Sequence, residues 1–200
     1  AFDGTPEDTR RLASCGREIS GVEVRVVDEE TGVDVRPGQV GEIVARGPNV
    51  MLGYWKRGPE TAAALRGGYM HTGDLATVDD QNFIYIVDRA KDMIISGGEN
   101  VYSTEVESAI YEHPAVLEAA VIGVPDEQWG EAVLAVVVRK EGVEVTEAEI
   151  IAHCKMLIAG YKTPKRVVIQ DAPLPKSGPG KILKTELRKP FWEGKERMVN

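Results

Sequence analysis

The chain has 200 residues, 42% of them hydrophobic, and a formal net charge of −8. This acidic balance argues against nucleic acid or an anionic membrane surface as the main partner, because dense phosphate charge repels such a chain. The sequence shows no signal-peptide pattern and no apolar run near ~18 residues, so we expect no transmembrane segment. The two cysteines, Cys15 and Cys154, match no metal-ligand spacing and indicate a reduced, cytoplasmic setting.

The first half of the chain predicts short β-strands separated by turns. Apolar and charged residues alternate over 22–28, and further strands are expected within 40–47, 67–80 and 82–89. Gly32, Pro37, Gly38 and Gly47 mark turns between the early runs. This half is expected to form a small antiparallel sheet or distorted barrel.

The second half mixes helices with strands. A helix is expected over 103–113 with Ser103 or Thr104 as its N-cap, and another over 146–160 that stops at Gly160. Apolar, β-branched runs at 119–124, 132–138 and 166–170 predict strands, and a last short helix begins within 182–189. The fold class is therefore α+β, with a domain boundary near Arg89 to Asp92.

Several motifs permit both a structural and a functional interpretation. Asp74 in GYMHTGD either caps a turn or accepts hydrogen bonds from a ribose diol with its two carboxylate oxygens. The run DRAKD at 88–92 is either a solvated charge cluster or a hinge centred on Lys91. The adjacent glycines Gly97 and Gly98 permit another molecule to approach the backbone closely.

The segment PKSGPGK at 175–181 is not a phosphate-binding P-loop, since Pro175 and Ile182 stand where Gly and Ser or Thr are needed. It is a Pro/Gly loop that presents Lys181, either as a solvated charge or as an ammonium for a developing oxyanion. The histidines form no catalytic or metal-binding constellation that spacing supports, and we predict no metal ligand in the chain.

Four segments, in this order, resemble the signatures of the adenylate-forming family, which includes acyl- and aryl-CoA synthetases, luciferases and nonribosomal-peptide adenylation domains. They are GYWKRGPETAAAL, GYMHTGD, DRAKDMIISGGENVYSTEVE and PLPKSGPGKILK, and the resemblance extends from about Ala13 to Lys189. It implies a C-terminal fragment, consistent with a start at Ala1 without Met. Residues 1–88 would be the last β subdomain of the AMP-binding domain, 89–91 the hinge, and 92–200 the mobile C-terminal domain.

The resemblance also implies roles for individual residues. Asp74 would bind the ribose hydroxyls of ATP or AMP, with Arg89 as a second ribose or phosphate contact. Lys91 stands at the hinge position. Lys181 would bridge the substrate carboxylate and the α-phosphate, because the reaction joins two anions.

A second set of residues is implied for CoA. Gly97 and Gly98 would leave room for the pantetheine arm, with Glu99 beside it. Trp129 and Tyr161, otherwise rim or core aromatics, would offer flat faces for adenine, and Lys165 would meet phosphate. Thr163 departs from the pattern, since some relatives have Arg there.

The implied function is a ligase that converts a carboxylic acid, ATP and CoA to acyl-CoA, AMP and pyrophosphate, with Mg²⁺ on the nucleotide held mainly by a missing N-terminal domain. The fragment alone is expected to be inactive. One alternative is an adenylation domain that loads a carrier protein. Another is a non-enzymatic stable fragment or a substrate for a lysine acyltransferase and deacylase at Lys181. The acid cannot be identified from this chain.

Overall fold

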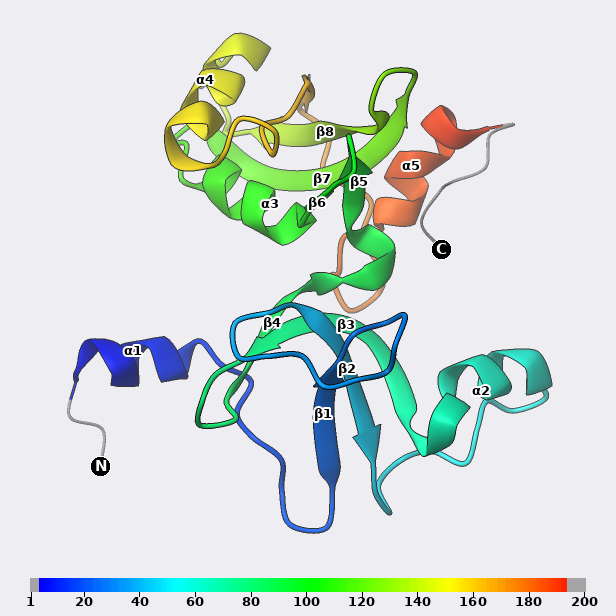
Figure 1. The fold of residues 1–200 in the computed structure, drawn as a ribbon. Coiled ribbons are helices and arrows are strands. Elements are labelled where there is room, and N and C mark those ends of the chain that lie inside the picture. The colour runs from blue at the N-terminus through cyan, green and yellow to red at the C-terminus, as the bar shows by residue number, and fades with distance from the viewer. Residues whose placement is uncertain (1–3, 194–200) are drawn as a thin grey trace. The chain divides into compact units, whose positions relative to one another are not determined.

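The computed structural model describes residues 4–193 and divides into two compact units, Ala1–Ala90 and Lys91–Asn200 (Figure 1). Each unit is described separately. The outermost residues of the two expected domains, 1–3 and 194–200, lie outside the described residues.

The first unit is built on a four-stranded antiparallel sheet. Its strands follow chain order as β1 (Glu23–Val27), β2 (Gly41–Arg46), β3 (Met70–Val78) and β4 (Ile84–Arg89). A small core of Val26, Ala76 and Ile84 is buried on it. The predicted strands are confirmed, but the sheet is open, so the expected distorted barrel does not close in the described residues.

Three short helical segments that the sequence did not predict complete this unit. The helix α1 (Pro6–Leu12) begins at a capping box, in which Thr5 and Asp8 satisfy each other's backbone amides. The helix α2 (Gly58–Ala64) and the 3₁₀ turn η1 (Arg66–Gly68) precede β3. A further 3₁₀ turn, η2 (Ala90–Asp92), spans the boundary between the units.

The second unit contains a five-stranded mixed sheet. It comprises β5 (Ile94–Ser96), β6 (Glu99–Val101), β7 (Val116–Asp126), β8 (Gly130–Arg139) and β9 (Arg166–Gln170). The central strand β8 pairs antiparallel with β7 along its length and parallel with β9, while β5 meets it only at Ser96 and Gly130.

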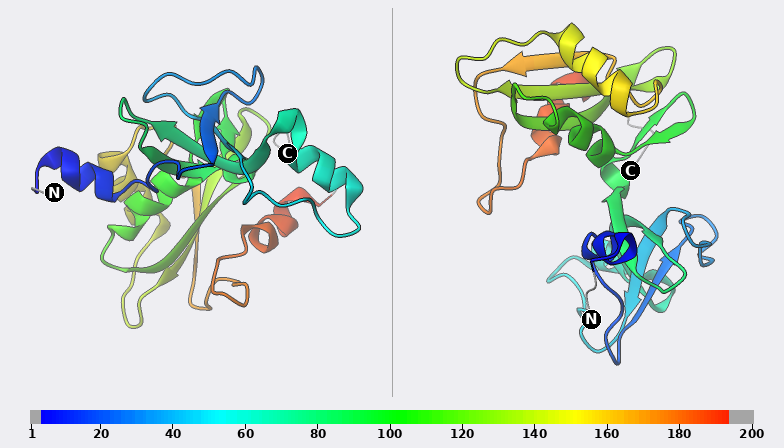
Figure 2. Two further views of the ribbon diagram at one scale, coloured as in Figure 1. Left: turned by 90° about the horizontal axis from the view of Figure 1, so that it is seen from below. Right: turned by 90° about the vertical axis from the view of Figure 1, so that its left-hand side faces the viewer.

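Helices cover both faces of this sheet, as Figure 2 shows: α3 (Ser103–Tyr111) and α4 (Glu147–Leu157) on one, α5 (Lys184–Trp192) on the other. Successive residues of β7 and β8 therefore enter two different cores. Val121 and Val133 pack with α3 and α4, whereas Ile122 and Leu134 pack toward α5. A sheet buried on both faces explains why these strands are continuously apolar.

Two helix boundaries were predicted wrongly. The N-cap of α3 is Tyr102, without a side-chain hydrogen bond, because the hydroxyl of the fully buried Ser103 instead accepts from Lys184 Nζ at 2.7 Å. The helix α4 ends at Leu157, three residues before Gly160, and its start is fixed by a capping box between Thr146 and Glu149.

Candidate functional site

The segment carrying Asp74 forms a bulge in the first sheet. Glu42 pairs with Leu75 and Val44 pairs with His71, so residues 72–74 of β3 lie opposite Ile43 alone. Gly73 adopts a φ of 72°, a conformation that a glycine takes without strain. The Thr72 hydroxyl donates to Ile43 O at 2.8 Å and accepts from the Asp74 amide at 3.1 Å. These bonds fix the direction in which the bulge presents Asp74.

A buried carboxylate, Glu42, supports the bulge from below. Its side chain is 4% exposed and accepts from the Gly73 amide at 3.0 Å, while His71 Nδ1 and Arg66 Nη2 lie 2.6 and 3.2 Å from its Oε2. Glu42 was not among the residues predicted from the sequence. An acid at the start of the otherwise apolar run GEIVA was the available signal, because a buried charge needs partners.

Asp74 lies within β3 opposite Arg89 of β4, so the alternative of a turn cap is wrong. The Arg89 guanidinium Nε is 3.2 Å from Asp74 Oδ1, and the two side chains remain 51% and 31% exposed. An accessible carboxylate beside a cation can accept hydroxyl groups while the guanidinium meets a phosphate.

Lys91 is exposed on η2, and the two compact units divide between Ala90 and Lys91. The next residue, Asp92, is fastened to the last helix: its Oδ1 lies 2.8 Å from Arg188 Nη1, with side chains 14% and 9% exposed. The second unit therefore holds the chain firmly one residue beyond Lys91.

The paired glycines form the turn of the β5–β6 hairpin, with φ values of 63° at Gly97 and 85° at Gly98. A Cβ on Gly97 would lie 2.7 Å from the Trp129 ring, whereas one on Gly98 would meet nothing within 4 Å. The Trp129 ring therefore occupies the side-chain position of Gly97, whereas that of Gly98 is open, and the CoA-binding role of both glycines stays a prediction. Glu99 is exposed at the start of β6.

The predicted aromatic and basic residues gather partly at this hairpin. Trp129 lies in the β7–β8 turn, and Lys165 Nζ is 5.8 Å from the centre of its ring. The Lys165 amide donates to Val133 O at 2.8 Å, which joins its loop to β8. Tyr161 is exposed in the same loop, beside Lys162. The buried Thr163 bonds a backbone carbonyl and presents no side chain to a ligand.

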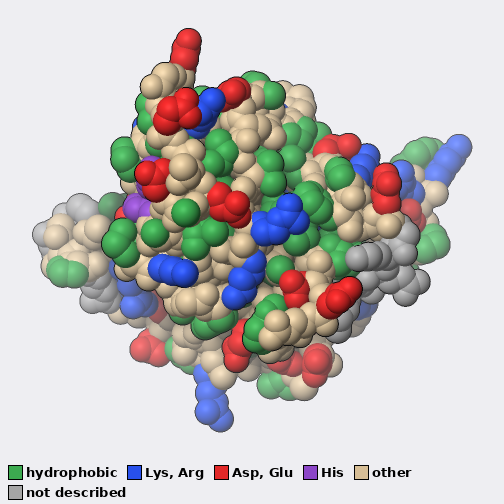
Figure 3. Space-filling model, turned by 90° about the horizontal axis from the view of Figure 1, so that it is seen from above, with side chains coloured by type: hydrophobic (Ala, Val, Ile, Leu, Met, Phe, Trp, Pro, Cys, Tyr) green, Lys and Arg blue, Asp and Glu red, His purple; other side chains and the backbone are tan. Residues whose placement is uncertain are grey.

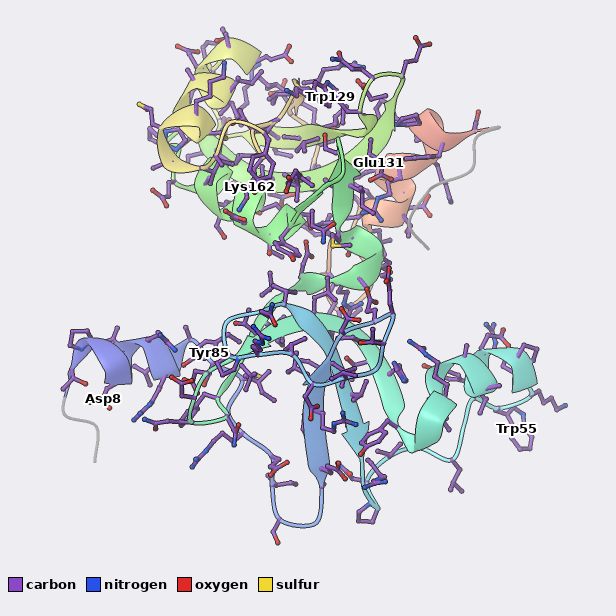
Figure 4. The ribbon with its side chains drawn as sticks, viewed as in Figure 1. Asp8, Trp55, Tyr85, Trp129, Glu131 and Lys162 are labelled. Atoms are coloured by element: carbon purple, nitrogen blue, oxygen red, sulfur yellow. The ribbon has the colours of Figure 1, made fainter. Side chains whose placement is uncertain are left out.

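Lys162, which the sequence analysis did not select, fixes this loop to α3. Its Nζ lies 2.7 Å from both carboxylate oxygens of Glu105, and this hydrogen bonding raises the pKa of the ammonium above its ordinary value. Figure 4 shows Lys162 near α3. The loop that carries Tyr161 and Lys165 is thus held at both ends.

Lys181 is exposed in a loop that folds back on itself, one residue before the bridge that closes this loop. Ser177 N donates to Lys181 O at 2.8 Å, and the isolated bridge between Lys176 and Ile182 closes the loop. Glu118 anchors the incoming side: it pairs with Lys176, which lowers the pKa of its carboxyl group, and it also accepts from the Leu174 amide.

On the outgoing side of the loop, Lys184 begins α5 and forms a buried polar cluster. Its Nζ lies 2.7 Å from Glu107 Oε1 and donates to Ser103 Oγ, and Glu107 also accepts from the Val121 amide at 2.8 Å. The loop is therefore clamped at its base and exposed at its tip.

The described residues contain no cluster of three or more potential metal-ligating side chains. Over the same residues, no helix has the length and apolar character needed to cross a membrane. On the face shown in Figure 3, Lys and Arg side chains are interspersed with Asp and Glu.

Comparison with known families identifies the class to which this arrangement belongs. The AMP-binding enzyme family matches residues 2–55, and the AMP-binding enzyme C-terminal domain family matches residues 105–181. The chain belongs to the AMP-binding, adenylate-forming enzymes.

Individual relatives are CoA ligases. The chain is 49% identical to a feruloyl-CoA synthase of an Amycolatopsis species over 181 residues, which are 90% of this chain and 36% of that one. It is 47% identical to the medium/long-chain-fatty-acid–CoA ligase FadD8 of Mycobacterium tuberculosis over 199 residues, 96% of this chain and 34% of that one. The crystal structure of ATP-bound MatB from Rhodopseudomonas palustris superposes with a TM-score of 0.84 at 39% identity, covering 92% and 37% of the two chains. The chain thus spans about a third of the length of these relatives.

Proposed function

We propose that the chain is the C-terminal part of an AMP-forming acid–thiol ligase, which activates a carboxylic acid with ATP and transfers the acyl group to CoA. The observation that carries the proposal is the division of the chain between Ala90 and Lys91. The Asp74–Arg89 pair lies on one side of this division, and the Lys181 loop and the glycine hairpin lie on the other.

In the first step, the substrate carboxylate attacks the α-phosphorus of ATP, the bond to pyrophosphate breaks, and an acyl-adenylate forms. Asp74 accepts the ribose hydroxyls and Arg89 contacts ribose or phosphate. The Lys181 ammonium offsets the repulsion between the carboxylate and the phosphate. Mg²⁺ would accompany the ATP phosphates, and we assign it no ligand in this chain.

In the second step, the CoA sulfur attacks the acyl carbon, AMP leaves, and the thiol proton is released. Gly98 gives the pantetheine arm open backbone, with Glu99 beside it. Trp129 and Tyr161 offer faces for adenine, and Lys165 offers positive charge for phosphate. Rotation at Lys91 would replace the Lys181 loop by the hairpin. Separate anchors for the two segments support this, because either segment can be presented without unfolding the other.

The acid itself is left open. A feruloyl-CoA synthase and a fatty-acid–CoA ligase match this chain almost equally well, at 49% and 47% identity. The portion covered by this chain therefore does not discriminate between acids.

The test compares the full-length gene product with the isolated chain 1–200. The gene product should show acid-dependent exchange between ATP and pyrophosphate and should form a thioester with free CoA. The isolated chain should show no exchange above a heat-killed control. Exchange by the isolated chain, or transfer only to a phosphopantetheinyl carrier protein, would contradict the proposal.

We further propose that the exposed Lys181 is a target for a lysine acyltransferase and a deacylase. Lys181 is exposed, and acylation would remove the charge on which the first step depends. Mass spectrometry of protein isolated from cells should detect acylated Lys181. Uniformly unmodified Lys181 across growth conditions would contradict this.

A further inference from the structure

The glycine hairpin is attached to the second sheet by very little regular pairing. The strand β5 meets β8 at one pair of residues, Ser96 and Gly130, and the Gly97 amide donates to Trp129 O at 2.9 Å. Beyond this point β5 and β8 separate, so the usual ladder of backbone hydrogen bonds does not continue.

Next to the single pair between β5 and β8, a buried side chain of β8 accepts a hydrogen bond from the backbone of β5. Glu131 follows Gly130 on β8, is fully buried, and accepts from the Ile95 amide through Oε2 at 3.3 Å. Figure 4 shows Glu131 beside β5. A carboxylate therefore makes the contact to β5 that a backbone carbonyl makes in a regular sheet.

The neighbouring strand is adapted to this carboxylate. A Cβ on Gly123 of β7 would lie 2.5 Å from Glu131 Oε2 and 3.2 Å from Ile94, so only glycine leaves space for the Glu131 side chain. The next seven residues of β8, from Ala132 to Val138, are all buried and apolar. Burying a charged group among them costs several kcal/mol unless hydrogen bonds compensate. Core packing alone would favour an apolar residue at this position.

We infer that Glu131 is a positioning residue that holds the glycine hairpin in the orientation needed for thioester formation. The inference rests on the proposed function, because it assigns the hairpin to the CoA-dependent step. Glu131 does not touch substrate in this scheme. It acts through Ile95, which lies two residues before Gly97.

The experiment uses Glu131→Gln, with Glu147→Gln as the matched control. Glu147 also accepts a strand amide through its carboxylate, from Val167 of β9 at 2.8 Å, and so it tests the same kind of bond away from the hairpin. A second variant, Gly123→Ala, displaces the Glu131 carboxylate without removing its charge. Gly123→Ala tests the inference even if Glu131→Gln does not fold.

Two kinds of measurement are made. Hydrogen exchange on chain 1–200 should be faster at residues 94–98 in Glu131→Gln and Gly123→Ala, and faster only near Val167 in Glu147→Gln. In the full-length gene product, thioester formation from synthetic acyl-adenylate and CoA should fall at least about tenfold in the first two variants, since misplacement by ~1 Å costs up to ~10²-fold. Adenylate formation from acid and ATP should stay within about twofold of wild type.

Unchanged exchange at residues 94–98, or faster exchange with normal thioester formation, would overturn the inference. Equal loss of both half-reactions would also overturn it, because it would show a general structural role. If the wild-type gene product makes adenylate but no thioester with CoA, the proposed function fails instead. The hydrogen-exchange rates at residues 94–98 then still decide whether Glu131 holds the hairpin.

Discussion

Asp74 and Arg89 face each other across β3 and β4, with Arg89 Nε 3.2 Å from Asp74 Oδ1. The bulge at Gly73 and the buried Glu42 beneath it fix Asp74 at this place. Because the pair is partly exposed, its value for stability is small, about 0 to 1 kcal/mol. The role that we propose for the pair is therefore in nucleotide binding and not in stabilising the fold.

Replacement of Asp74 by Ala should weaken nucleotide binding by the full-length gene product. We expect the KM for ATP to rise by about tenfold or more, since hydrogen bonds to a charged acceptor are worth ~1.5–3 kcal/mol. Steady-state kinetics with varied ATP measure this, with Asp80→Ala, an exposed acid elsewhere in the unit, as the control. An unchanged KM would remove Asp74 from the nucleotide site.

Replacement of Lys181 by Ala should separate the half-reactions. Adenylate formation should fall by ~10²–10³, as for loss of one preorganised oxyanion donor, while thioester formation from synthetic acyl-adenylate should remain near normal. Lys189→Ala is the control, because Lys189 is exposed and pairs only locally with Glu186 among the contacts described. A Lys181→Ala variant with normal adenylation would reduce Lys181 to a solvated charge.

Replacement of Lys91 by Pro should separate the half-reactions in the opposite sense, by slowing thioester formation and not adenylate formation. Proline fixes φ near −65° and so restricts rotation between the two units. We expect slower thioester formation with largely intact adenylate formation, measured as above. Lys91→Ala, which keeps the backbone free, should behave like wild type. If both half-reactions fall equally in Lys91→Pro, Lys91 is not the pivot.

The two glycines of the hairpin should differ in their tolerance of Ala. Both have positive φ, so each substitution costs about 1 kcal/mol from backbone conformation. Gly97→Ala must also displace the Trp129 ring and should lower the free energy of unfolding further than Gly98→Ala. Urea unfolding of chain 1–200 measures both variants. Equal losses would show that Trp129 moves aside without cost.

Stability should depend on pH through His113, which packs edge-on against His153 with ring centres 5.1 Å apart. Burial, and secondarily His153, lower the pKa of His113 from its ordinary 6.5. The unfolded chain then binds the proton more readily, so the free energy of unfolding falls as pH drops below 6.5. In His113→Gln this slope should be reduced, as urea unfolding at several pH values would show. Parallel pH profiles for the two proteins would contradict the assignment.

The strands and principal helices were predictable because they depend on local patterns. Alternation over 22–28 and the apolar runs of β7 and β8 follow directly from which faces are buried. Helix ends were less predictable, since Ser103 lies inside α3 and not at its N-cap, and its hydroxyl accepts from Lys184, which is 81 residues away. The hairpin at Gly97 and Gly98 was visible as a glycine pair, but its strands have only three residues each and carry little pattern.

Candidate site residues could be selected from the sequence where they belong to ordered motifs, as Asp74, Lys91 and Lys181 do. Their roles stay predictions. The supporting carboxylates Glu42 and Glu131 were missed because each is a single acid in an apolar strand, and its partners come from other strands. Such residues become evident only when the distances between strands are known.

The ion pair between Asp92 and Arg188 joins the beginning of the second unit to its last helix. A turn of the chain at Lys91 would therefore be passed to α5 directly, without first deforming the sheet. Since α5 also starts where the Lys181 loop ends, this helix connects the proposed hinge at Lys91 with the loop that carries Lys181. Loss of this linkage would uncouple rotation at Lys91 from movement of the Lys181 loop. The two half-reactions would then be poorly coordinated, even in a protein whose binding sites are intact.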